Sequence, residues 1–136
     1  MSDHDARVWD IEEEVGAEAL LALVTDLYDR LYDDLLVGFF FLPFPKQRLI
    51  DHQLEYVRAR LGPPGARYTG QSMLTAHERH PILPAHFDRR HVVLTEVLSD
   101  HGIPAHVRDA WLALDLSLRP LIVRKGAERR EDMLKS

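Results

Sequence analysis

The chain of 136 residues contains no cysteine. Without a thiol it can form no disulfide, no Cys-ligated zinc or iron–sulfur site and no thiolate nucleophile. No apolar run approaches the roughly 18 residues that a membrane-spanning helix needs. The polar, acidic residues 1–5 also differ from the basic and apolar start of a secretory signal. We therefore expect a cytoplasmic protein with no membrane partner.

Positive charge is also scarce, with 17 Lys and Arg against 22 Asp and Glu and a net charge of −5. A nucleic-acid partner is not expected, because binding to phosphates needs clustered positive charge. The basic residues near the end of the chain are interleaved with acidic ones, which is typical of a solvated helix end or tail. Eight histidines are a high count that makes a metal site of interest.

The pattern that is present is helical periodicity interrupted by Pro and Gly, with no convincing strand. Helices are predicted over about 17–32, 45–61, 71–79, 84–100 and 104–123. Pro120 should kink the last helix or end it early. Length and composition predict one all-α domain. We assign residues 1–10 to a polar arm, 11–124 to the domain and 125–136 to a charged tail.

Two polar residues lie within apolar helical arcs. Tyr28 belongs to the apolar face of the first long helix, and Gln53 lies near the middle of the apolar face of the second. A buried hydroxyl or amide needs hydrogen-bond partners, and leaving it without them costs about 1–3 kcal/mol. Either group could bond to backbone at a helix crossing, or both could line one polar pocket.

His77 lies in a short helix beside Met73 and Leu74, where its imidazole would face an apolar space, as haem iron requires. A hydrogen-bonded core histidine is the structural alternative. His77 and His80 are three residues apart, so they do not match the zinc protease motif, whose histidines are four apart. No glycine-rich phosphate loop or nucleophile elbow is present either.

In order and spacing, these residues resemble the truncated haemoglobins, small globins with a two-over-two helical sandwich. The similar segments over residues 11–123 are Leu27–Arg30, Asp33–Phe40, His52–Tyr56, Leu61–Gly62, Tyr68–Gly70, Met73 with His77, and Ile82 with His86 and Phe87. Group I fits best. Gly16 stands where the family has a Gly-Gly pair, and Arg90 in a region that is usually apolar. Arg90 could border the haem edge and reach a propionate, or point to solvent.

The resemblance implies an all-α, globin-like fold that holds haem b, with His77 as the proximal iron ligand. It implies that Phe40 packs on the porphyrin, that Tyr28 and Gln53 are distal hydrogen-bond donors, and that Leu49 lies over the iron. The remaining implied contacts are Met73, Leu74, Ile82 and Phe87 along the porphyrin plane, and Tyr68 and His52 near the propionates.

The implied function is reversible binding of dioxygen, with NO and CO as further diatomic ligands, for oxygen transport or NO detoxification. An NO dioxygenase or peroxidase-like activity would need an external reductase, because the chain has no flavin- or nicotinamide-binding segment. Two alternatives stay open. The same pocket could serve a gas sensor that acts through a partner, or the chain could be a haem-free helical interaction module.

Overall fold

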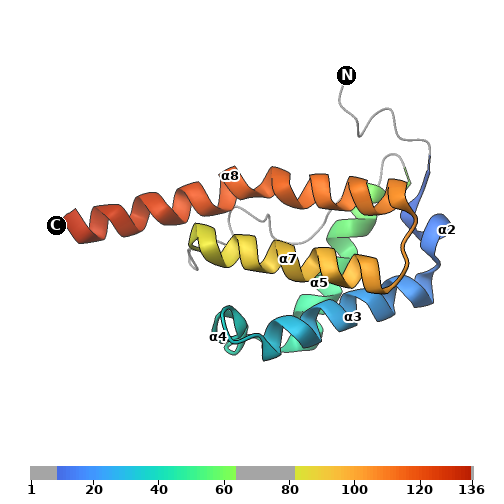
Figure 1. Ribbon diagram of the computed structural model, residues 1–136, viewed down its shortest axis with the longest axis horizontal. Helices are drawn as coiled ribbons and strands as arrows, with labels where there is room; N and C mark the ends of the chain where they lie inside the picture. Colours follow the sequence, from blue (N-terminus) through green and yellow to red (C-terminus); the bar gives the residue numbers. More distant parts are fainter. Residues whose placement is uncertain (1–8, 64–81, 136) are drawn as a thin grey trace, which may run out of the picture.

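The computed structural model describes residues 9–63 and 82–135, and in this part of the chain every regular element is a helix (Figure 1). The helices are α2 (Ile11–Val15), α3 (Ala17–Asp33), α4 (Gly38–Phe41), α5 (Lys46–Leu61), α7 (Pro84–Asp100) and α8 (Ala105–Lys135). The boundaries predicted for α3, α5 and the start of α7 are confirmed to within a residue. The helix expected at 71–79 lies outside the described residues.

The predicted apolar faces are the buried faces. On α3 they comprise Leu20, Val24, Leu27, Tyr28 and Leu31, and on α5 Ile50, Gln53, Leu54, Tyr56, Val57 and Leu61. Phe87, Leu94 and Leu98 of α7 and Val107, Trp111 and Leu118 of α8 are buried as well. Recurrence at three and four residues places such side chains on one side of a helix, so burial of that side stabilises both the helix and the fold.

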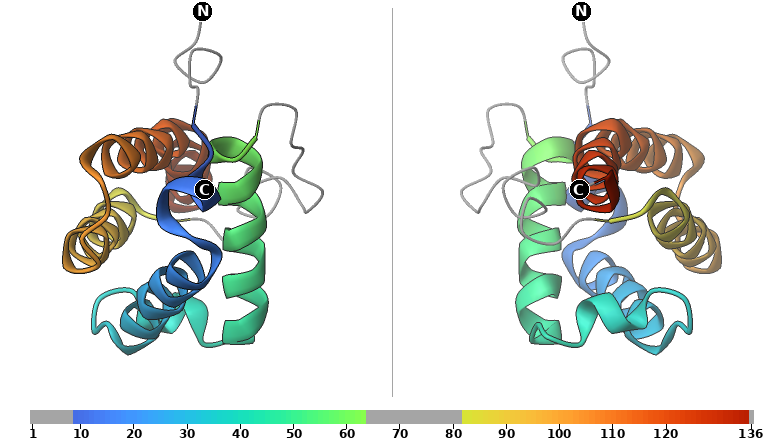
Figure 2. Two further views of the ribbon diagram at one scale, coloured as in Figure 1. Left: turned by 90° about the vertical axis from the view of Figure 1, so that its right-hand side faces the viewer. Right: turned by 90° about the vertical axis from the view of Figure 1, so that its left-hand side faces the viewer.

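Helix α3 lies at the centre of the fold. It packs against α2, α4, α5 and α7, while α8 packs on α7. In the end-on views of Figure 2, α5 lies on one side of α3, and α7 and α8 lie on the other. The fully buried residues of the main apolar core come from all of these helices except α4, whose half-buried Phe40 and Phe41 pack against it. A smaller cluster of Tyr56, Phe87, Leu118 and Val123 joins α5, α7 and α8.

Two glycines allow the sharp changes of direction between helices. Gly16, between α2 and α3, has φ 93°, which a residue with a Cβ rarely adopts, and Ala17 already begins α3. Gly16 alone therefore makes the turn into α3, at a position where a Gly-Gly pair was expected from the family pattern. Gly102 has φ 63° and turns the chain from α7 into α8, with its N–H bonded to the Ser99 carbonyl at 3.0 Å.

The expectation that Pro120 ends the last helix early is wrong, because α8 continues through it to Lys135 (Figure 1). Pro120 lies on an exposed side of α8. A proline removes one backbone hydrogen bond, and water can solvate the freed carbonyl where the helix surface is open. Among the described residues, no helix has the length and apolar character needed to cross a membrane.

Candidate functional site

Tyr28 is a buried hydrogen-bond donor. It lies on the inner face of α3 with 7 % of its surface exposed, and its ring meets Phe41 edge-on, with 6.1 Å between the ring centroids. Burial raises the pKa of the Tyr28 hydroxyl, and the charge of Arg90 acts in the opposite direction without reversing the shift. The hydroxyl therefore keeps its proton at neutral pH and can donate it to a neighbouring acceptor.

Gln53 is the second buried polar group on these packed helices. It lies on α5 with 4 % of its surface exposed, between the buried Ile50 and Val57. No residue among 9–63 and 82–135 hydrogen-bonds its side-chain amide. Helix α5 packs directly on α3, so the buried Gln53 and Tyr28 belong to two helices that are in contact.

Phe40 lies in the short helix α4 and contacts the start of α7. Its ring stacks on Phe39 with 4.2 Å between centroids, and it meets the His86 ring at 4.7 Å and 64°. The Nδ1 atom of His86 is buried and has no hydrogen-bond partner in the part of the chain that the structure describes. Leaving a buried imidazole nitrogen without a partner costs free energy. The region around Phe40 and His86 is therefore suited to a ligand that the imidazole could contact.

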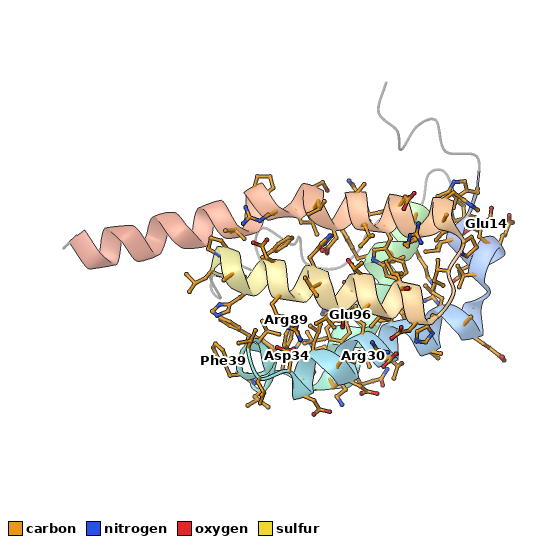
Figure 3. The ribbon with its side chains drawn as sticks, viewed as in Figure 1. Glu14, Arg30, Asp34, Phe39, Arg89 and Glu96 are labelled. Carbon is orange, nitrogen blue, oxygen red and sulfur yellow. The ribbon has the colours of Figure 1, made fainter. Side chains whose placement is uncertain are left out.

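An ion pair joins the C-terminal end of α3 to α7. Asp34, at the end of α3, accepts hydrogen bonds from Arg89 at 2.7 and 2.9 Å and from the backbone N–H groups of Leu36 and Val37 (Figure 3). The bonds from Arg89 lower the pKa of Asp34. A shallow surface depression beside this pair contains none of the predicted site residues.

The other predicted site residues fall into two sets. Leu49 is half-buried against the main core, Ile82 packs with the buried Phe87 in the smaller cluster, and His52 is half-buried on α5. Tyr68, Met73, Leu74 and His77 lie outside the described residues. The haem contacts assigned to both sets stay predictions.

A buried charged cluster that was not predicted from the sequence lies between α7 and α8. Asp115 has 4 % of its side chain exposed and accepts hydrogen bonds from Arg90 and from His91 Nδ1, the latter at 2.8 Å. Burial alone would raise the pKa of Asp115, but the charge of Arg90 and the hydrogen bonds from His91 and Arg90 outweigh it and lower the pKa.

Arg90 therefore points into the protein, with 15 % of its side chain exposed, and the solvent-facing alternative is wrong. The sequence did hold a signal for its partner. Asp115 follows Trp111 by four residues and precedes Leu118 by three, which puts a carboxylate on the apolar face of the last helix. A charge in that position requires a buried partner.

Comparison with known proteins assigns the family. The family model of bacterial-like globins matches residues 11–119, which is most of the chain. This chain belongs to the bacterial-like globin family. The resemblance to truncated haemoglobins and the all-α globin fold expected from it are thereby confirmed.

The relatives of this globin include truncated haemoglobins from several organisms. It is 32 % identical over 107 residues to the group 1 truncated hemoglobin GlbN of Mycolicibacterium paratuberculosis, covering 79 % of this chain and 78 % of that one. It superposes on the Fe(III) form of Tetrahymena pyriformis truncated hemoglobin with TM-score 0.72 and 25 % identity, covering 85 % and 98 %. THB11 of Chlamydomonas reinhardtii gives TM-score 0.72 and 24 % identity, covering 84 % and 94 %.

Proposed function

We propose that this globin holds haem b with His77 as the iron ligand and reversibly binds dioxygen in a pocket to which Tyr28 and Gln53 contribute. The observation that carries the proposal is the pair of buried donors on α3 and α5, two helices that pack on each other in a globin fold. Membership of a globin family supports haem binding and gas binding in general. The identity of the haem, the ligand and the residue roles are our proposal.

The described residues fit such a group. Gln53 is a buried polar residue, and the His86 Nδ1 atom is buried with no hydrogen-bond partner among residues 9–63 and 82–135. Leu49, Phe40, Ile82 and Phe87 would supply apolar contacts, with Met73 and Leu74 from the segment that carries His77. His52 and Tyr68 are the polar residues assigned to the propionates. Haem iron, when bound, supplies the position at which a diatomic gas binds reversibly.

The chain's own residues would set the affinity for the gas. A bound dioxygen carries partial negative charge, so the Tyr28 O–H and the Gln53 N–H groups would stabilise it as donors. These donors act in a dry interior, where a hydrogen bond is electrostatically stronger than in water. The apolar side chains around them exclude water and keep the donors available to the ligand.

Tyr28→Phe and Gln53→Ala are each expected to speed dioxygen release about tenfold, because each removes a donor bond of about 1.4 kcal/mol. Stopped-flow displacement of dioxygen by CO measures the rate. The matched control is Tyr32→Phe, whose hydroxyl donates to the Phe44 carbonyl at 2.7 Å. Its off-rate should equal that of the wild type. Unchanged rates in both site variants would assign the pocket to other residues.

An absorption spectrum separates the haem protein from a haem-free interaction module. Purified protein titrated with haemin is expected to develop a Soret band that saturates at one haem per chain. A fully folded protein that gives no saturable Soret band under reducing or oxidising conditions would refute the proposed function and favour the module.

The cellular role that we propose is oxygen binding or NO detoxification in the cytoplasm. If the role is NO detoxification, mixing the dioxygen-loaded protein with one equivalent of NO should yield one nitrate per haem. Repeated turnover would then require electrons from an external reductase. Release of dioxygen without nitrate formation would favour simple oxygen transport.

A further inference from the structure

His86 lies in the first turn of α7, between two aromatic rings of α4. The ring of Phe40 meets the imidazole at 4.7 Å and 64°, and that of Phe39 meets it at 5.8 Å and 86°. Figure 3 shows Phe39 beside the N-terminal end of α7. The Nδ1 atom of His86 is buried, and residues 9–63 and 82–135 provide no hydrogen bond to it. Because such a nitrogen costs free energy, its burial favours a ligand as its partner.

A second histidine of this fold shows what an imidazole in such surroundings binds. His106 lies in the first turn of α8, and its ring meets that of Trp9 edge-on at 5.3 Å and 79°. Its Nε2 atom pairs with the carboxylate of Glu14 at 3.2 Å. His106 therefore combines an aromatic contact with a carboxylate partner. His86 has the aromatic contacts, but no described residue bonds its buried nitrogen.

The first turn of α7 is also suited to a negative charge. Helix α7 begins at Pro84, its N-cap residue Leu83 offers no side-chain hydrogen bond, and its first turn has no acidic residue. The N-terminal end of a helix carries a partial positive charge, which favours an anion there. The first basic residue along α7, Arg89, is already bound by Asp34 at 2.7 Å. This field supports an anion partner for the Nδ1 atom of His86.

We propose that the Nδ1–H group of His86 donates a hydrogen bond to a propionate of the haem. The inference rests on the proposed function, in which Phe40 packs on the porphyrin and His77 binds the iron. The rim of the porphyrin is apolar apart from its propionate carboxylates. A propionate is therefore the haem group that can bond a nitrogen beside Phe40, and the bond selects the tautomer with its proton on Nδ1. His86 thus joins His52 and Tyr68 at the propionates.

The test compares haemin with its dimethyl ester, which lacks the carboxylate charge, in the wild type and in His86→Phe. Phenylalanine keeps an aromatic ring against Phe39 and Phe40 and removes the ring nitrogens. The rate at which haem passes to excess apomyoglobin measures how firmly it is held. Loss of a charge-assisted hydrogen bond should speed the transfer of haemin about tenfold. Transfer of the dimethyl ester should be affected several-fold less, because the ester offers His86 no charged oxygen.

His106→Phe is the matched control, because it removes an imidazole that also contacts an aromatic ring in the first turn of a helix. Both of its transfer rates should equal those of the wild type. Thermal unfolding of the apoprotein adds a measurement that needs no haem. The melting temperature of His86→Phe without haem should be at least that of the wild type, because the substitution removes a buried polar atom that lacks a partner. The same substitution therefore weakens haem retention without weakening the fold.

Three results would overturn the inference. Equal acceleration of both haems by His86→Phe would mean that the imidazole only packs against Phe40. Unchanged transfer of both haems would mean that it does not contact the cofactor. A lower melting temperature of the haem-free variant would mean that the Nδ1 atom already has a partner within the chain. Failure of the proposed function looks different, since the wild type would then give no saturable Soret band with haemin or with its ester.

Discussion

His77→Ala is expected to yield a folded protein that no longer retains haem at one equivalent per chain. The imidazole would supply the bond to iron from the protein, and the apolar contacts of the porphyrin alone would leave it exchangeable. The loss should appear as a Soret absorbance per chain that falls toward zero after gel filtration. Melting temperature should fall as well, because a ligand that binds only the folded state stabilises it.

The control for this experiment is His101→Ala. The His101 imidazole bonds Asp26 at 2.9 Å on the surface between α7 and α3, so its loss should leave haem content unchanged. Addition of free imidazole to His77→Ala should restore a Soret band, since the vacated position can take an external ligand. Stoichiometric haem in His77→Ala without imidazole would refute the proximal assignment and direct attention to His52, His80 and His86.

The helices of this globin could be predicted because the residues that become buried recur at the spacing of a helical turn. Leu20, Val24, Leu27 and Leu31 recur at the spacing of one helical face, and that face is buried. The same periodicity predicts that Tyr28 and Gln53 face inward, and both are buried. Such patterns need only residues a turn or two apart, so one sequence suffices to find them.

Partners across helices could not be predicted in the same way. Arg90 and Asp115 are 25 residues apart in the chain, and their meeting depends on how α7 and α8 pack. A helical wheel shows that Arg90 has two possible surroundings and cannot choose between them. The expectation that Pro120 ends the last helix early was wrong for a related reason. The cost of a proline in a helix depends on whether the freed carbonyl faces water, and that depends on the tertiary packing.

Asp115→Ala is expected to be the most destabilising single substitution that we propose in the described part of the chain. It leaves the Arg90 guanidinium buried without its counterion, which costs about 3–5 kcal/mol. Thermal unfolding of the haem-loaded protein at neutral pH, followed by circular dichroism, should show a melting temperature lower by roughly 10 °C or more. Asp88→Ala, which breaks the exposed pair with Arg119, should have the same melting temperature as the wild type. Arg90→Met with Asp115→Leu should recover most of the loss.

The same carboxylate predicts how stability depends on acidity. The pKa of Asp115 is lowered in the folded protein below the value of about 3.9 that an unfolded chain gives it. Its contribution to the free energy of unfolding is therefore fully present above that value and is lost as pH falls through the folded pKa. The difference in urea midpoint between the wild type and Asp115→Asn should stay constant from about pH 5.5 to about pH 4.5 and shrink below about pH 4. A difference that had already vanished at the upper end of this range would mean that Asp115 is not ionised beside Arg90.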